Sequence, residues 1–321
     1  MDMAEVVRPS SAPRAERPPD GAADRRARQT PRRGGRRAHG AVAVLLLPFV
    51  LLFLLFYVAP IGYALYQSFF KVQRDGTFGR PETVFGGFEQ YVRVFENEAF
   101  RESVGRVLVF GIVQVPVMLG LALIFALLLD SGLLPLKRFF RLAYFAPYAV
   151  PGVIAAIIWG VLYSPALSPF SWVTERVPFM SGSLVLWSLA NVTTWMFTGY
   201  NTLIIYAALK AVPQELYEAA RLDGAGDIRI ALSIKVPMVR PALVLTGVFS
   251  IIGTLQLFTE PQVFRSLTTA VTGSYTPNLV VYSTSVIPNF NLAAAFSVVL
   301  ALATFALSFV FLRITQRGSS L

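Results

Sequence analysis

The sequence contains no cysteine and a single histidine among its 321 residues. Without cysteine, the chain can form neither a disulfide framework nor a thiolate metal site. The lone histidine, His39, stands at the edge of the first apolar segment, where we interpret it as a bystander. A zinc site built from nitrogen and sulfur ligands is therefore excluded, and we expect the chain to bind no metal.

Charged residues are also scarce, at 14% of the sequence against about 25% in typical soluble domains. Hydrophobic residues make up 55%, in blocks close to the roughly 20 residues that a membrane-spanning helix needs. The middle of every block is free of ionisable side chains, and Asp130 and Glu260 stand only at block ends. This absence argues against a proton pump with a buried carboxylate relay and against an intramembrane protease with paired aspartates.

A phosphate-binding loop of the pattern G-x-x-x-x-G-K-[ST] is missing as well. The chain therefore cannot hydrolyse ATP by that route, and we expect it to have no catalytic residues and not to be an enzyme. If it moves a solute uphill, the energy comes from a partner or from a coupling ion.

Six apolar blocks predict an all-α bundle of six transmembrane helices. Pro147 and Pro151 stand near the start of the third block, which predicts an irregular or kinked entry. The predicted spans cover residues 41–66, 104–129, 142–163, 184–209, 242–258 and 292–312.

The N-terminal segment has a different composition from the membrane domain 41–321. Residues 1–38 hold ten arginines against five acidic residues and no apolar periodicity, which predicts a disordered tail over residues 1–40. Binding of nucleic acid or anionic lipid is one interpretation of this tail. We favour a solvated extension whose arginines keep the N-terminus in the cytoplasm. That orientation places 20 of the 28 lysines and arginines inside, with both termini cytoplasmic.

Polar side chains share one face of the helix in the fourth and in the fifth span. They are Asn191, Thr194, Thr198 and Asn201 in the fourth, and Thr246, Ser250 and Thr254 in the fifth, with Gly253, Gln256 and Glu260 beside the latter three. Such a stripe either bonds packed helices to each other or lines a hydrated path for a solute. The spacing favours packing, whereas a glutamine facing lipid needs a partner and favours the path.

The segment 211–240 is the longest predicted cytoplasmic loop, and its sequence predicts two short helices joined by glycines. Pro213 suits the start of the first helix, while Gly224 and Gly226 end it and permit a left-handed backbone. The second helix is expected to end at Pro237. The pair is shaped to be bound by a cytoplasmic partner, or else it lies along the bilayer and binds nothing.

This loop resembles the signature E-A-A-x3-G-x9-I-x-L-P of ABC importer permeases. The matching residues, with a valine in place of the leucine, are Glu218, Ala219, Ala220, Gly224, Ile234, Val236 and Pro237. A likeness to carbohydrate-importer permeases of the maltose/glycerol-phosphate type rests on segments 87–91, 146–151, 210–217 and 290–295. The resemblance covers about residues 42–315, with its core at 104–315, and leaves out the tail.

The resemblance implies a multi-pass subunit in the inner (plasma) membrane of a bacterial-type cell. Such a permease pairs with a second, similar permease and with two cytoplasmic ATPase subunits, which hold the ATP and Mg²⁺. An extracytoplasmic binding protein delivers a sugar or sugar derivative, and closure of the ATPase pair tilts the spans by alternating access. No nucleic acid is expected as a partner. The residues expected to dock on the ATPase are Glu218, Ala219, Ala220, Asp223, Gly224, Ile234 and Pro237.

The resemblance also implies a substrate path among the spans that flank the loop. Aromatic rings there suit the faces of sugars, while amides and hydroxyls suit their hydroxyl groups. Tyr200 points away from the polar face of an ideal helix, so we expect either a bend at Gly199 or a packing role for Tyr200. The candidates for the path are Thr194, Trp195, Tyr200, Asn201, Ser250, Thr254 and Gln256.

Two other classes of membrane protein are alternatives to this importer. An ion-coupled secondary transporter needs a coupling-ion site and usually an inverted repeat, and the sequence displays neither. A membrane scaffold or insertase would use the polar stripes for packing alone. The loop discriminates between the classes, because only the importer needs a cytoplasmic docking pair with that spacing.

Overall fold

The computed structural model describes residues 35–74, 80–131, 134–286 and 289–317. The chain divides into two compact units, Met1–Ala59 and Pro60–Leu321. The predicted tail lies almost wholly outside the described residues, so its disorder and its boundary at residue 40 stay predictions.

The first unit contains one apolar helix. α1 (Gly35–Phe53) continues through a π-helical turn, η1 (Leu54–Val58), into α2 (Ala59–Gln67), most of which belongs to the second unit. The turn stands directly before Pro60, where the Ala59 N–H bonds to the Leu54 carbonyl five residues back. Because proline has no N–H and crowds the preceding turn, a local widening of the helix relieves the clash. The segment Val44–Gln67 is long and apolar enough to span a membrane, as predicted.

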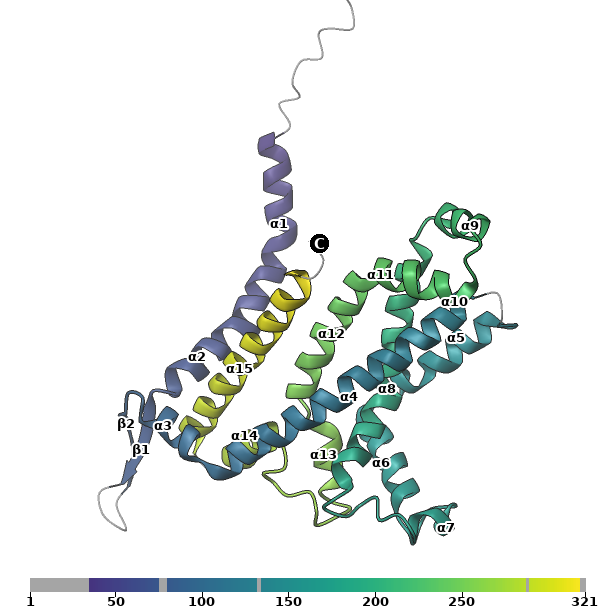
Figure 1. The fold of residues 1–321 in the computed structure, drawn as a ribbon. Helices are drawn as coiled ribbons and strands as arrows, with labels where there is room; N and C mark the ends of the chain where they lie inside the picture. Colours follow the sequence, from purple (N-terminus) through teal and green to yellow (C-terminus); the bar gives the residue numbers. More distant parts are fainter. Residues whose placement is uncertain (1–34, 75–79, 132–133, 287–288, 318–321) are drawn as a thin grey trace, which may run out of the picture. The chain divides into compact units, whose positions relative to one another are not determined.

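The second unit is built on four long helices that pack side by side (Figure 1). α4 lies along α8, and α12 packs against both α4 and α15. These helices are α4 (Glu98–Asp130), α8 (Val185–Lys210), α12 (Arg240–Leu255) and α15 (Phe290–Arg317). Each contains one predicted span to within a few residues, although the fifth span continues beyond α12 into α13 (Thr259–Phe264).

Length and hydropathy identify four candidate spans within the described residues, or up to five if a bent helix pair is one span. α8 covers the predicted fourth span with 26 residues but is not among the four. Its asparagines and threonines lower its hydropathy. The fold is therefore mostly helical with several membrane-spanning helices, while the count of six stays a prediction.

The bent pair is the predicted third span, and it confirms the expected irregular entry. α5 (Lys137–Phe145) leads through the 3-10 turn η2 (Ala146–Ala149) to α6 (Gly152–Tyr163), and the helix axes differ by 96°. Val150 between them is extended, with φ −78° and ψ 126°. A residue that precedes a proline is driven out of the helical region, so Pro151 accounts for the break.

The all-α expectation is wrong for the segment after α2. β1 (Phe70–Arg74) and β2 (Pro81–Phe85) form an antiparallel hairpin, in which Phe70 faces Phe85 and their rings meet edge to face at 5.6 Å. α3 (Glu89–Glu96) follows, and Glu89 pairs with Lys71 of β1 and, at 2.6 Å, with Arg93. The cross-strand aromatic pair stabilises a hairpin that has too little alternation to be predicted.

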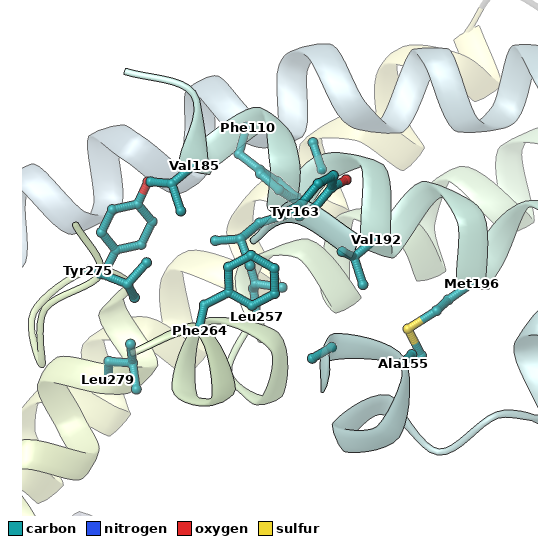
Figure 2. Close-up of a cluster of buried hydrophobic side chains, with 14 residues drawn as sticks. Phe110, Ala155, Tyr163, Val185, Val192, Met196, Leu257, Phe264, Tyr275 and Leu279 are labelled. Atoms are coloured by element: carbon teal, nitrogen blue, oxygen red, sulfur yellow. The ribbon is translucent and has the colours of Figure 1, made fainter. Parts of the chain in front are cut away.

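The largest buried cluster joins α4, α6, α8, α13 and α14 (Pro277–Val286) (Figure 2). The rings of Phe110, Tyr163 and Phe264 and the side chains of Val192 and Leu279 pack within it. Tyr163 also accepts a hydrogen bond from Asn191 Nδ2 at 2.8 Å. This cluster holds the first half of α8 against α6 and α13, and so fixes the walls of the cavity described next.

Candidate functional site

A cavity of about 380 Å³ lies among α4, α8 and α12, next to the turn η2 and the start of α13. Its volume falls within the roughly 300–1,000 Å³ of small-molecule sites. Aromatic rings and uncharged polar groups make up most of its wall. The lining residues are Phe110, Gln114, Met118, Tyr148, Thr193, Phe197, Tyr200, Asn201, Phe249, Ser250, Gly253, Thr254, Gln256, Leu257, Phe258, Thr259 and Glu260.

Two broken spans meet at this cavity. The fifth span is interrupted between α12 and α13, where Phe258 adopts φ −141° and ψ −51°. The third is interrupted after Tyr148. Non-helical backbone at membrane depth is tolerated only where protein covers it or water reaches it. Both breaks are therefore consistent with a hydrated cavity at this place.

Five of the seven candidates for the substrate path line the cavity together: Tyr200, Asn201, Ser250, Thr254 and Gln256. The other two do not line it. Thr194 is the neighbour of the lining residue Thr193, and it accepts a hydrogen bond from Gln114 Nε2 at 3.3 Å. Trp195 packs edge to face on Trp159, with ring centroids 5.8 Å apart.

Tyr200 lines the cavity without the bend that was expected at Gly199. α8 runs unbroken from Val185 to Lys210. Tyr200 stacks on Tyr148 of η2, with ring centroids 4.7 Å apart and 19° between planes. Gly199 serves instead for a close approach, because a Cβ there would lie 1.7 Å from the Tyr144 carbonyl oxygen. The two tyrosines thus form one aromatic wall of the cavity.

The polar stripes serve packing at some positions and line the cavity at others. Asn191 bonds to Tyr163, as described, and does not line the cavity. Thr246 is buried and donates to the Ala242 carbonyl at 3.0 Å. Thr254 both lines the cavity and packs against α4. Its Cγ2 lies 2.9 Å from the position that a Cβ on Gly111 of α4 would occupy. Each of the two interpretations holds for part of the stripe.

Four polar residues that line the cavity were not predicted: Gln114, Tyr148, Thr193 and Thr259. Glu260, which was expected beside the polar stripe of the fifth span, lines the cavity as well. Glu260 is 7% exposed, and its Oε1 lies 3.5 Å from the place of a Cβ on Gly152, the first residue of α6. The positive end of a helix favours a carboxylate at that position. Within the described part of the chain, no lysine, arginine or histidine lines the cavity. Two features of the sequence could have pointed to two of the four unpredicted residues. Gln114 is a polar residue inside an apolar span, and Tyr148 stands between the two prolines that break the third span.

The loop 211–240 forms the predicted pair of helices at the end of α8 (Figure 1). Gly224 ends the first helix with φ +81°, the left-handed backbone that was predicted. Gly226 is ordinary extended backbone with φ −74°, so that part of the prediction is wrong. The second helical stretch also runs through Pro237 to Met238. Its elements are α9 (Gln214–Leu222), α10 (Asp227–Ile230), η3 (Ala231–Lys235) and α11 (Val236–Met238).

A small core of its own supports this loop. Val212, Tyr217 and Ile230 are buried, with Ala220, Ala225 and Ile234 packed against them. Of the predicted docking residues, Ala220 and Ile234 belong to this core, and the remaining five are exposed: Glu218, Ala219, Asp223, Gly224 and Pro237.

Large apolar side chains are also exposed on the loop. Leu222 is 89% exposed and Ile228 78%, with Leu216 and Leu232 also exposed. Burial raises the pKa of the Tyr217 hydroxyl beneath them, and the negative charge of Asp130 adds to the effect. Exposed apolar side chains set among charged residues of both signs, on a loop with its own core, are a feature of protein-binding surfaces.

Comparisons with known proteins agree with this architecture. Residues 119–317 match the family described as "Binding-protein-dependent transport system inner membrane component". The chain is 31% identical over 242 residues to the lactose transport system permease protein LacF of Rhizobium radiobacter, covering 70% of this chain and 79% of that protein. It is 31% identical over 290 residues to the sulfoquinovosyl glycerol transport system permease protein SmoG of Agrobacterium fabrum, covering 86% and 90%.

The fold is similar to that of a chain in the crystal structure of a bacterial ABC transporter that imports the acidic polysaccharide alginate. The TM-score is 0.74 at 18% identity, covering 88% of this chain and 97% of that chain. Both the family match and the relatives extend over more than half of the sequence. The chain therefore belongs to the binding-protein-dependent transport system inner-membrane components, the membrane permeases of ABC importers.

Proposed function

We propose that this permease forms the translocation path for an uncharged saccharide, together with a second, similar permease. Two ATPase subunits supply the energy, and an extracytoplasmic binding protein delivers the sugar. The observation that supports the path most directly is the cavity, where five polar or aromatic candidates from the fourth and fifth spans meet at the breaks of the third and fifth spans. Six spans with both termini in the cytoplasm are part of the proposal and put the loop on the ATPase side.

The chemistry of the cavity supports a saccharide as the substrate. Tyr148 and Tyr200 offer rings suited to the apolar faces of a sugar, while Gln114, Asn201 and Gln256 offer amides for its hydroxyl groups. Similar relatives are named for lactose, which is uncharged, and for sulfoquinovosyl glycerol, whose sulfonate group is anionic. A wall of rings and amides binds polyols without requiring any charge on the ligand.

The electrostatics of the cavity support an uncharged substrate over an anionic one. Glu260 is the one ionisable acidic residue in the described lining, and no basic residue stands among the described wall residues. The start of α6 would attract an anion, but the Glu260 carboxylate already stands beside it. An anionic sugar would therefore meet an acidic side chain and no basic one among the described wall residues.

The loop 211–240 is proposed to dock on an ATPase subunit. Its exposed Glu218 and Asp223 flank the apolar patch that Leu222 and Ile228 present, and its own core keeps this surface in shape. The ATP and Mg²⁺ belong to the ATPase, so this chain needs no cofactor of its own. Movement of the docked loop would then tilt the spans around the cavity.

Uptake by the assembled importer in lipid vesicles tests this function. We expect ATP-dependent accumulation of at least one of lactose, maltose and trehalose, and none of glycerol 3-phosphate or of an alginate disaccharide. The variants Gly224→Asp and Glu218→Lys should abolish uptake while the protein stays in the membrane. Normal uptake by both variants would remove the docking claim, and accumulation of only the anionic probes would remove the claim about substrate charge.

A further inference from the structure

Asp130 connects the docking loop with two of the membrane helices. It is the last residue of α4, and its side chain is 6% exposed. Its Oδ1 lies 2.8 Å from Nζ of Lys210, the last residue of α8. Its Oδ2 lies 2.6 Å from Nζ of Lys235, the last residue of η3 within the loop. One carboxylate therefore holds three elements that are distant in the sequence.

Lys235 and Lys210 differ in their exposure to solvent and in the aromatic ring that each ammonium group contacts. The Lys235 side chain is 15% exposed, and its Nζ also lies over the ring of Tyr217 in α9, 4.9 Å from the centroid. The Lys210 side chain is 45% exposed, and its Nζ lies over Tyr206 of its own helix at 5.4 Å. A buried, continuous set of contacts therefore runs from α9 through Lys235 to Asp130. The Lys210 side chain is more open to solvent, and its ammonium group lies over a ring of its own helix, although its charge also acts on Tyr217.

α4 extends these contacts to the cavity. Met118, Gln114 and Phe110 stand on the same helix as Asp130 and line the cavity. At about 1.5 Å of rise per residue they lie roughly 18–30 Å along the helix from Asp130. α4 has no proline between Asp130 and Met118, and Pro116 stands just beyond, so a displacement of its end moves at least the part of the cavity wall at Met118.

We propose that Asp130 is a positioning residue that transmits movement of the docking helices to α4 through Lys235, while Lys210 only fixes the end of α8. The proposal rests on the docking function proposed above. Ion pairs screened from solvent keep most of their strength at physiological salt, so the link to Lys235 persists while the loop moves. Without it, the docking loop would move with the ATPase while α4 lags behind.

Substitution of each lysine separately tests this assignment. The assembled importer is placed in vesicles, and ATP hydrolysis is measured together with uptake of the neutral disaccharide that the unmodified importer accumulates. Lys235→Met should lower the number of sugars imported per ATP roughly fivefold or more. Lys210→Met, which leaves the link between Asp130 and Lys235 intact, should not change this ratio.

Glu89→Gln provides a matched control at a distant place. Glu89 also holds two cations, Lys71 and Arg93, but on the hairpin and α3 rather than at the loop. The ratio should be unchanged in this variant. Equal losses in Lys235→Met and Lys210→Met, or parallel falls of uptake and hydrolysis in Lys235→Met, would overturn the proposal.

A second measurement does not depend on the substrate. Because the chain has no cysteine, spin labels can be attached at Leu222→Cys on α9 and Ile124→Cys on α4, both of which are exposed. The distance distribution between the labels should be broader in Lys235→Met and unchanged in Lys210→Met. An unchanged distribution in Lys235→Met would contradict the link, even if the importer carries no sugar that was tested.

Discussion

At the scale of single residues, the cavity depends on the places where a side chain is missing as much as on those where one is present. Gly199 admits the Tyr144 carbonyl to the surface of α8, and this contact brings η2 close enough for Tyr148 to stack on Tyr200. The aromatic wall therefore requires a glycine one residue before the tyrosine.

Gly199→Ala is expected to destabilise the protein by roughly 3 kcal/mol or more, because overpacking against backbone cannot be relieved by a rotamer change. Gly120→Ala is the matched control in a long helix, since nothing lies within 4 Å of the new Cβ. Thermal unfolding of the purified variants in detergent measures the difference. Equal melting temperatures for the two variants would show that α5 does not pack on Gly199 as described.

Asn201, Ser250, Thr254 and Gln256 could be named from the sequence because polar side chains in an apolar helix stand out. Tyr200 was named from the family resemblance, against its position on an ideal helix. The cavity's other walls could not be predicted in this way, since they come from helices whose contacts are set by packing. Trp195 was also assigned to the path, although packing on Trp159 holds its ring away from the cavity wall. The spacing of residues along one helix does not show which other helix packs against each of its side chains.

At the scale of elements, the long helices that contain the predicted spans were predictable to within a few residues, because apolar length is a local property of the sequence. The bend of the third span was also predictable from Pro147 and Pro151. The hairpin 70–85 was not, since its strands are stabilised by a cross-strand ring pair and by contacts with α3. The left-handed turn at Gly224 was correctly predicted, and that at Gly226 was not.

The two loop glycines offer a comparison in which only the backbone differs. A Cβ added at either glycine would have no atom within 4 Å, but φ is +81° at Gly224 and −74° at Gly226. Gly224→Ala should cost about 1–2 kcal/mol in the docking conformation, which weakens ATPase binding roughly 5–30-fold. Gly226→Ala should bind as the unmodified chain does. Titration of the ATPase onto the purified permease measures both, and equal affinities would contradict the proposed role of the turn.

The hairpin has a pH dependence of known sign. Pairing with Lys71 lowers the pKa of the Glu89 carboxyl below its ordinary 4.5, and Arg93 adds to this effect. A lowered pKa means that the pairing stabilises the fold above the ordinary pKa and is lost as the pH falls through the lowered value. The protection factor of the β1 amides, which corrects the exchange rate for its intrinsic pH dependence, should therefore fall only in that acidic range. The protection factor of the β1 amides in the variant Glu89→Gln should show no such change in this pH range. A change that persists in the variant would mean that a group other than Glu89 causes it.

At the scale of the whole molecule, the chain combines a cavity among the membrane helices with an exposed loop that we propose docks on an ATPase subunit. The loop's spacing alone predicted the family, because docking on an ATPase requires a surface of defined shape. The nature of the sugar follows from no sequence pattern, since it depends on how several walls close around one space.

The assignment to an ABC importer can be tested by purifying the tagged chain from its native host in mild detergent and identifying the co-eluting proteins by mass spectrometry. We predict that an ATPase and a second permease co-elute, and that Gly224→Asp loses the ATPase while keeping the second permease. A chain that elutes alone or only with copies of itself would contradict the importer, and the polar cavity would then have to be tested as an ion path.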